Sequence, residues 1–542
     1  MNRGRRNEIL ILVIVLMALF LVFSVSFRHG HHWGDDFSQY IVQARAVVDG
    51  SVQDTYEESK YRYDYSENKL IGPVLYPWGY PLLLSAVYAL RGFDILAMKA
   101  FTSLFFLLSL AVVFFLFRGR ITFTRNLLIV VLLGINPAFF EARDDVLSDF
   151  PFLFFSLLSL LLMQRTVVDR KTLAGPLGDS VLIGACMFLS FSTRMAGVVL
   201  LPTLLLVQLV ESVRSYRLSR TIPFRFTAFL APYAVFFVLA SALEIWLPSS
   251  SSYADQLGDF GWGSVTRNLM LYAKLPVDFF TTSMGPWLTV AGKLLFLISI
   301  PALCLGAVRT AGGSCLFILF PALYMALLIA WPGVQGLRFM FPVMPFFLLF
   351  LFQGMDGAAS RLSLMPGQRL GVLSPAAAYG AVALLIFGAT SLGQAFRAVQ
   401  HPGYVLDGPY TRDSASLFGF IAHNTRKDDV VIFSKPRAMW LFAGRRSVRL
   451  SRLEDIMVSE ARFIACRRDD PVDKALHNKI WIAKKVYVND SFSLYARMSA
   501  RPEPMKTGSD PPVRKVSGTK GGQGAKKKGP GKRRTVTIEI RL

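Results

Sequence analysis

Two adjacent carboxylates, Asp35 and Asp36, follow directly after the first apolar run of the chain. A carboxylate can take a proton from a hydroxyl group, so this pair is a candidate general base. The residues after Asp36 place apolar side chains at helical spacing up to Gly50, which predicts an amphipathic helix too short to cross a bilayer. Either aspartate could instead act only as the N-terminal cap of that helix, so both roles stay open at this point.

A second acidic cluster lies in "EARDDVLSD" and contains Asp145 and Asp149. Three arginines at the ends of apolar runs are candidates to bind an anion: Arg143, Arg194 and Arg338. Each has a simpler interpretation. Arg194 and Arg338 could be interfacial side chains whose charge reaches water, and Asp149 could only cap a helix before Pro151.

The composition defines the class of protein. Hydrophobic residues make up 53% of the 542 residues, and apolar runs of nearly membrane-spanning length recur along the chain. We predict an α-helical polytopic membrane protein with about eleven spanning helices. The first is a retained helix over 9–27, and the others cover 97–117, 125–141, 147–163, 180–193, 195–211, 226–247, 286–308, 314–331, 338–354 and 371–396.

Charge in the connections predicts the orientation. Segments such as "RGRITFTR" and "ESVRSYRLSRTIPFR" are basic, whereas those on the opposite side, such as "EARDDVLSD", are acidic or aromatic. Basic connections accumulate on the cytoplasmic side. We therefore expect a protein of the cell (inner) membrane with its N-terminus in the cytoplasm and its C-terminal domain in the periplasm.

The chain divides into parts of different character. Residues 1–396 form the predicted membrane part, with outer loops at 28–96 and 248–285, and residues 397–505 have the pattern of a small α/β domain. Residues 506–534 are basic and glycine-rich, which predicts disorder, and residues 535–542 alternate like a strand. The basic segment is a solvated tail or attracts anionic lipids or wall polymers. We expect contact with membrane lipids and no nucleic acid partner.

Several short motifs occur in a recognisable order. They are Asp36 with Tyr40 four positions later, the turn "YPWGYPLL" from Tyr76, "LSDFPF" from Leu147, the helix start "RFMFPVMP" from Arg338, and "DDVVIFSKPRAMWLFAGR" from Asp428. In these motifs the chain resembles the lipid-linked-sugar glycosyltransferases of the GT-C superfamily. Specifically, it resembles the branch of glycosyltransferase family 39 that includes protein O-mannosyltransferases and the aminoarabinose transferase of lipid A. Trp78 departs from the second proline found in many relatives.

The resemblance implies transfer of a sugar from a polyprenyl phosphate to an acceptor hydroxyl on a lipid, glycan or protein at the outer face of the membrane. It implies Asp36 as the general base with Asp35 assisting. The leaving phosphate needs a cation, from Arg338 or less firmly Arg143 or Arg194, while Asp145 and Asp149 would orient these cations or line the acceptor site. Tyr40 and Tyr76 belong to the matching motifs and are expected at the substrate site.

Two further questions stay open in the sequence. A divalent metal such as Mg²⁺ or Mn²⁺ could bind Asp35, Asp36 and the second acidic cluster, although no His or Cys spacing typical of a metal site occurs. The alternative function is a multi-pass transporter or flippase, and a third is a non-catalytic scaffold. Transporters place coupling charges near the middle of helices, whereas these acidic residues lie at helix ends.

Overall fold

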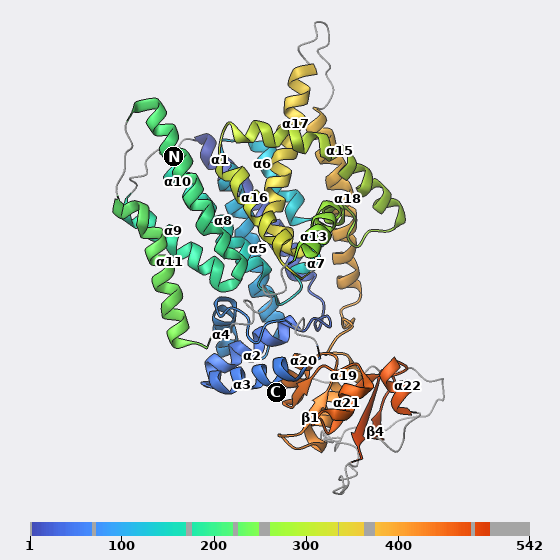
Figure 1. The fold of residues 1–542 in the computed structure, drawn as a ribbon. Coiled ribbons are helices and arrows are strands. Elements are labelled where there is room, and N and C mark those ends of the chain that lie inside the picture. Colours follow the sequence, from blue (N-terminus) through green and yellow to red (C-terminus); the bar gives the residue numbers. More distant parts are fainter. Residues whose placement is uncertain are drawn as a thin grey trace, which may run out of the picture.

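The computed structural model of the chain describes residues 3–67, 72–169, 176–220, 226–248, 261–333, 335–362, 374–477 and 483–498. A bundle of long helices forms one end of the molecule, and a small mixed domain lies at the other end (Figure 1). The basic segment 506–534 and the terminal strand 535–542 predicted from the sequence lie outside the described residues.

Apolar helices build the bundle. In the described residues, eight helical segments are long and apolar enough to cross a membrane, and three shorter apolar helices accompany them, compared with about eleven spanning helices predicted. The long helices are α1 (Arg3–Val25), α5 (Ile95–Phe117), α8 (Asp149–Met163), α10 (Leu200–Ser219), α11 (Phe226–Trp246), α15 (Pro286–Ala311), α17 (Met344–Leu362) and α18 (Pro375–Gln400). The shorter ones are α6 (Phe123–Gly134), α9 (Leu177–Thr193) and α16 (Leu316–Ala330).

Short helical turns extend three of these segments. A π-helical turn, η2 (Gln164–Asp169), continues α8, while the 3-10 turns η3 (Met195–Val199) and η5 (Leu337–Val343) lead into α10 and α17. The predicted loop 248–285 contains α13 (Trp262–Lys274), η4 (Leu275–Val277) and α14 (Asp278–Thr281). The helical start at Leu337 places Arg338 at the end of a membrane segment.

The predicted single span over 125–141 is wrong. Helix α6 ends at Gly134, and a separate short helix, α7 (Pro137–Ala142), follows. Asn136 between them is extended, and its side-chain oxygen accepts hydrogen bonds from the amides of Ala138 and Phe139. Because Pro137 has no amide hydrogen and disfavours helical backbone in the residue before it, the helix breaks there and a new one starts.

Three helices cover the end of the bundle that faces the small domain: α2 (Asp36–Asp49), α3 (Val52–Tyr65) and α4 (Gly79–Arg91). We call this side the domain face. Helix α2 ends at Gly50, which adopts a positive φ of 70°, as the sequence predicted. Phe37 and Ile41 of α2 are fully buried, so this helix is a packed element of the domain face.

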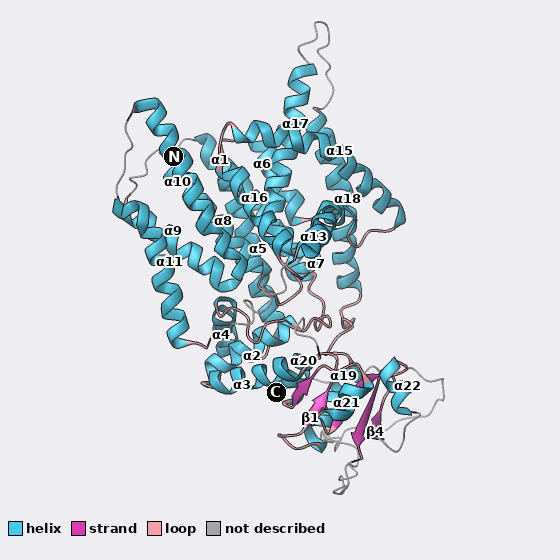
Figure 2. Cartoon of the chain, in the orientation of Figure 1, coloured by secondary structure: helices cyan, strands magenta, loops and turns pink. Residues whose placement is uncertain are grey.

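The small domain contains a five-stranded sheet with the order β2-β1-β3-β5-β4 (Figure 2). Strands β1 (Val430–Ile432), β2 (Arg446–Val448) and β3 (Phe463–Arg467) pair in parallel, and β4 (Ala483–Val488) and β5 (Phe492–Arg497) form the antiparallel side. Its helices are α19 (Arg412–Asn424), α20 (Pro436–Ala443), α21 (Leu453–Val458) and α22 (Pro471–His477). The α/β character predicted from the sequence is confirmed.

Helix α20 joins the small domain to the domain face. Leu441 of α20 packs in one apolar cluster with Phe37, Tyr40 and Ile41 of α2. This contact aims the N-terminal end of α20 at the start of α2, where Asp35 and Asp36 lie.

Candidate active site

Asp36, the first residue of α2, lies at the centre of a group of polar side chains from distant parts of the chain. Its Oδ1 accepts a hydrogen bond from the Tyr76 hydroxyl at 2.6 Å, and its Oδ2 accepts one from Nη2 of Arg338 at 2.8 Å. The structure thus brings together three residues selected from the sequence. We call the group formed by Asp36, Tyr76, Asp149, Arg194, Arg338 and Arg437 the Asp36 cluster.

Arg437 is the member of the cluster that the sequence analysis did not select. It extends from the first turn of α20, and its Nη1 donates to the Tyr76 hydroxyl at 3.0 Å and lies 3.7 Å from Oδ1 of Asp36. Its Nη2 donates to the carbonyl of Pro73 at 2.8 Å. A Cβ on Gly72, where φ is +101°, would lie 2.8 Å from this guanidinium, so glycine permits the close approach. The signal was present, since Arg437 belongs to the "SKPRAMW" part of a quoted motif.

The arginines keep Asp36 ionised. Burial alone would raise the pKa of Asp36, but the charges of Arg338 and Arg437 and the hydrogen bond from Tyr76 outweigh it and lower the pKa to about 2. The Asp36 side chain is still 29% exposed. The cluster therefore presents an ionised carboxylate that a molecule from outside can reach.

Asp149 ties two arginines to this site. Its Oδ1 accepts a hydrogen bond from Nη1 of Arg194 at 2.8 Å, and its Oδ2 lies 3.7 Å from Nη1 of Arg338. The Arg194 guanidinium also stacks on the ring of Phe339 at 4.2 Å. Two carboxylates, those of Asp36 and Asp149, thus stand against three arginines, and such an excess of guanidinium groups suits an anion.

The ring of Tyr40 packs against the ring of Tyr76. The two ring centroids are 4.6 Å apart, and the Tyr40 hydroxyl pairs with Oγ of Ser148 at 2.9 Å. The side-chain amide of Gln43 bonds both the amide and the carbonyl of Tyr76. Tyr40 and Gln43 lie one turn apart on α2, so this helix fixes the position of the Tyr76 hydroxyl.

Asp35 has a different role from its neighbour. Its side chain makes no capping hydrogen bond to α2, although Asp35 occupies the N-cap position. Instead, Oδ1 of Asp35 accepts a hydrogen bond from the amide of Ala438 at 3.3 Å, in the first turn of α20. Burial raises the pKa of Asp35, an effect opposed by the charge of Arg437. Asp35 thus holds the helix that supplies Arg437.

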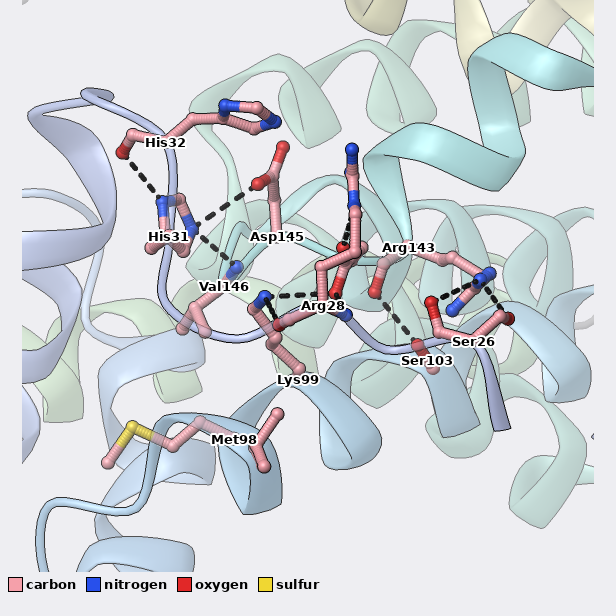
Figure 3. A network of polar contacts seen from close by, with 12 residues as sticks. Ser26, Arg28, His31, His32, Met98, Lys99, Ser103, Arg143, Asp145 and Val146 are labelled. Carbon is pink, nitrogen blue, oxygen red and sulfur yellow. Dashed lines mark hydrogen bonds and ion pairs between the residues drawn. The ribbon is translucent and has the colours of Figure 1, made fainter. Parts of the chain in front are cut away.

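The second acidic cluster is built around Asp144, and Figure 3 shows Arg28, Lys99 and Asp145 of this region. Its Oδ2 accepts a hydrogen bond from Nε of Arg28 at 2.6 Å, and its Oδ1 accepts one from Nζ of the fully buried Lys99 at 2.9 Å. We call Arg28, His31, Lys99, Asp144 and Asp145 the Asp144 cluster. It is a set of polar groups, with Lys99 and Asp144 buried and Arg28 and Asp145 partly exposed, that ties the end of α1 to α5 and to the segment after α7.

Asp145 points toward His31 and not toward Asp36. Its Oδ1 lies 3.5 Å from Nε2 of His31. That nitrogen accepts a hydrogen bond from the amide of Val146 at 3.0 Å, so the ring proton is on Nδ1, which donates to the carbonyl of His32. Burial lowers the pKa of His31 to about 3, and burial together with the charge of Asp144 raises the pKa of Asp145 to about 7.

Arg143 also lies apart from the Asp36 cluster. Its guanidinium is buried between the rings of Phe23 and Phe140, with centroid distances of 4.8 and 4.0 Å. Its Nη2 donates to Oγ of Ser26 at 2.5 Å (Figure 3). The structure places this residue against the end of α1, away from Asp36.

The acidic side chains that the sequence left open as ligands of a divalent metal are not arranged around a common ion position. Among the described residues, no group of three or more His, Cys, Asp or Glu side chains is arranged to hold an ion. Asp36 and Asp149 bond arginines, and Asp35 bonds a backbone amide. The positive charge at this site is supplied by guanidinium groups, so no step below depends on a metal.

Comparison with known proteins identifies the class of fold. No protein-family model and no curated protein matches the chain by sequence. Among solved structures, ArnT from Cupriavidus metallidurans in the apo state is similar with a TM-score of 0.56 at 13% identity, over 92% of this chain and 100% of that one. The same enzyme bound to undecaprenyl phosphate gives 0.54 at 13% identity, over 92% and 99%. The apo oligosaccharyltransferase of Archaeoglobus fulgidus gives 0.50 at 11% identity, over 90% and 74%.

These structures are GT-C membrane glycosyltransferases. The protein is therefore an integral membrane protein with the GT-C fold and a small C-terminal sheet domain, as the resemblance in sequence predicted.

Proposed function

We propose that the protein transfers a sugar from a polyprenyl-phosphate donor to an acceptor hydroxyl at the domain face of the membrane. The observation that carries this proposal is the position of Asp36, an accessible carboxylate between the Tyr76 hydroxyl and the guanidinium groups of Arg338 and Arg437. The GT-C fold supports it, because a similar structure was solved with undecaprenyl phosphate bound.

In this reaction Asp36 is the general base. Its carboxylate takes the proton of the acceptor hydroxyl as that oxygen bonds to the anomeric carbon of the sugar. The bond between that carbon and the phosphate oxygen breaks, and its electron pair stays on the phosphate, which gains a negative charge. An acceptor hydroxyl on a lipid, a glycan or a protein would satisfy the same chemistry.

Arg338 and Arg437 would stabilise the leaving phosphate, since charge-assisted hydrogen bonds from guanidinium groups suit phosphate oxygens. A phosphate that shares Arg338 with Asp36 also weakens the hold of this arginine on the carboxylate. The basicity of Asp36, whose pKa the arginines lower to about 2, would then rise when the donor binds. Donor binding would thus prepare the base.

The remaining selected residues have supporting roles in this proposal. Asp149 orients Arg338 and Arg194, Tyr40 positions Tyr76, and Asp35 holds α20. Asp145 and Arg143 act through the packing of the segment that carries Asp149. A transporter is disfavoured because Asp149, Arg194 and Arg338 lie at the ends of membrane segments and are paired within the Asp36 cluster.

The reaction would take place in the periplasm, at the inner membrane. Reporter fusions test this orientation, and we expect junctions after Phe27 and Phe396 outside the cytoplasm and a junction after Gly119 inside it. A cytoplasmic reporter after Phe27 would contradict the proposed location.

Transfer of a radiolabelled sugar from polyprenyl phosphate by the purified full-length protein tests the function. Asp36→Asn should lower the rate at least about 100-fold, since it removes the base. Asp49→Asn, an exposed change at the other end of α2, is the matched control and should retain the wild-type rate. Equal rates for the two variants would exclude Asp36 as the base, and movement of the labelled lipid between leaflets without sugar transfer would favour a flippase.

A further inference from the structure

A cavity lies on the domain face, apart from the Asp36 cluster. Its volume is about 550 Å³, and it lies between the end of α1, helix α7 and the end of α18. None of the described residues that line it belongs to the Asp36 cluster. Its polar lining includes Arg28, Glu141, Arg143, Asp144 and Arg397.

The charges around this cavity do not balance. Asp144 accepts hydrogen bonds from both Arg28 and Lys99, so one carboxylate faces two cations. Arg143 is 1% exposed, and its guanidinium donates hydrogen bonds to oxygens of Phe23 and Ser26. Within the described structure its buried Nε has no partner. A buried arginine without its own carboxylate is costly unless another anion completes the site.

The cavity opening adds positive charge. Arg397, in the last turn of α18, is exposed and lines the cavity. The one further carboxylate in the lining, Glu141, accepts hydrogen bonds from the Gln394 amide and the Ser283 hydroxyl. Three cations that line the cavity, Arg28, Arg143 and Arg397, thus face two carboxylates, those of Asp144 and Glu141, and Asp144 also accepts a hydrogen bond from the buried Lys99. This excess of positive charge suits an anion such as a phosphate group.

The surroundings indicate that the phosphate belongs to a lipid. The cavity lies where α1 and α18 leave their membrane segments, and both helices expose large apolar side chains there. Val25, Phe396 and Val399 are 60%, 62% and 54% exposed. Lipid chains can lie along these side chains while the headgroup enters the cavity, and basic pockets between membrane helices bind lipid headgroups in this way.

We propose that this cavity binds the phosphate headgroup of an anionic membrane lipid, at a site separate from the one proposed for the sugar donor. The bound phosphate would accept hydrogen bonds from Arg397 and Arg28 and offset the buried charge of Arg143. The lining residues Arg143 and Asp144 begin the segment that carries Asp149. A lipid bound in the cavity would therefore stabilise the position of Asp149 in the Asp36 cluster.

Native mass spectrometry of the full-length protein in neutral detergent tests the site, with phosphatidic acid as the probe and phosphatidylcholine as the neutral lipid. We expect a first phosphatidic acid adduct that forms more tightly than the phosphatidylcholine adduct. Arg397→Ala should weaken it about tenfold, the size of one lost charge-assisted hydrogen bond. Arg91→Ala, an exposed arginine in the last turn of α4, is the matched control and should leave it unchanged.

Three outcomes would overturn the proposal. The first is that the Arg397→Ala variant binds phosphatidic acid as tightly as the wild-type protein does. The second is loss of binding in Arg338→Ala, which would place the lipid in the Asp36 cluster. The third is displacement of the lipid by an equal concentration of glycerol 3-phosphate, which would show that the site recognises a free phosphate.

Discussion

Two of the aspartate doublets in the chain, Asp35–Asp36 and Asp144–Asp145, each follow an apolar helical stretch. Folding separates the members of both pairs. Asp36 remains partly exposed among arginines from other elements, and its pKa is lowered to about 2, whereas Asp144 is buried between Arg28 and Lys99. The other two members, Asp35 and Asp145, have raised pKa values because they are buried with weaker compensation.

The difference shows that a doublet alone does not define a role. Accessibility suits a reaction at Asp36, because its side chain is 29% exposed and a phosphate could compete with it for the partly exposed Arg338. Burial suits a structural role at Asp144, because its side chain is 2% exposed and its two oxygens already accept hydrogen bonds from Arg28 and Lys99. The two clusters should therefore respond to substitution in opposite ways.

The largest effect is expected at Arg338. Arg338→Ala removes the cation that bonds Asp36 and lies near Asp149, so sugar transfer should fall at least about 100-fold, because the leaving phosphate loses its stabilising charge. The measurement is the transfer rate at saturating acceptor. Arg338→Lys keeps the positive charge but cannot form bidentate hydrogen bonds, so its transfer rate should lie between those of the alanine variant and the wild type. No rate difference between the alanine variant and the wild type would remove Arg338 from the mechanism.

Asp144 should show the reverse pattern. Asp144→Asn leaves Lys99 buried without a carboxylate, so the free energy of unfolding should fall by about 3 kcal/mol. Denaturant unfolding in detergent measures this loss, and Asp49→Asn serves as the exposed control. The rate per folded molecule should fall much less than in Arg338→Ala. A stable but inactive Asp144→Asn protein would instead place Asp144 in the reaction.

Much of this arrangement follows from the sequence. Apolar length and charge indicated the helices, and motif order selected Asp36, Tyr76, Asp149 and Arg338, which the fold brings together. The split of the doublets could not be predicted, because it depends on which cations approach from distant elements. Lys99 lies 45 positions from Asp144 along the chain, and Arg437 lies in another domain. By contrast, the sequence does contain a signal for the helix break, namely Pro137 after Asn136. The span over 125–141 was predicted through it because the residues on both sides are apolar.

Asp35 should have an intermediate effect. Asp35→Asn keeps the size of the side chain but weakens its hydrogen bond to the amide of Ala438, so α20 and Arg437 should be held less firmly. We expect a roughly tenfold lower transfer rate, with a larger change in the Michaelis constant for the donor than in the turnover number. The double variant Asp35→Asn/Arg437→Ala should lose no more transfer activity, relative to the wild type, than the single variant Arg437→Ala. Fully additive losses would show that Asp35 does not act through Arg437.

The smallest effect concerns Asp145 and pH. A carboxyl whose folded pKa of about 7 exceeds its ordinary value of 3.8 stabilises the fold below about pH 4, and this contribution is lost as the pH rises through 7. Asp145→Asn is neutral throughout. Its melting temperature relative to the wild type should therefore rise between pH 4 and 7 and then level off. A difference that stays constant with pH would show that Asp145 titrates normally.

The central claim is that the base lies in the first doublet and not in the second. It is tested most directly by the rate of sugar transfer from polyprenyl phosphate for Asp36→Asn and Asp145→Asn, measured side by side on folded full-length protein. We predict a loss of at least about 100-fold for Asp36→Asn and less than about tenfold for Asp145→Asn. Full loss in Asp145→Asn with near-normal transfer by Asp36→Asn would contradict the account.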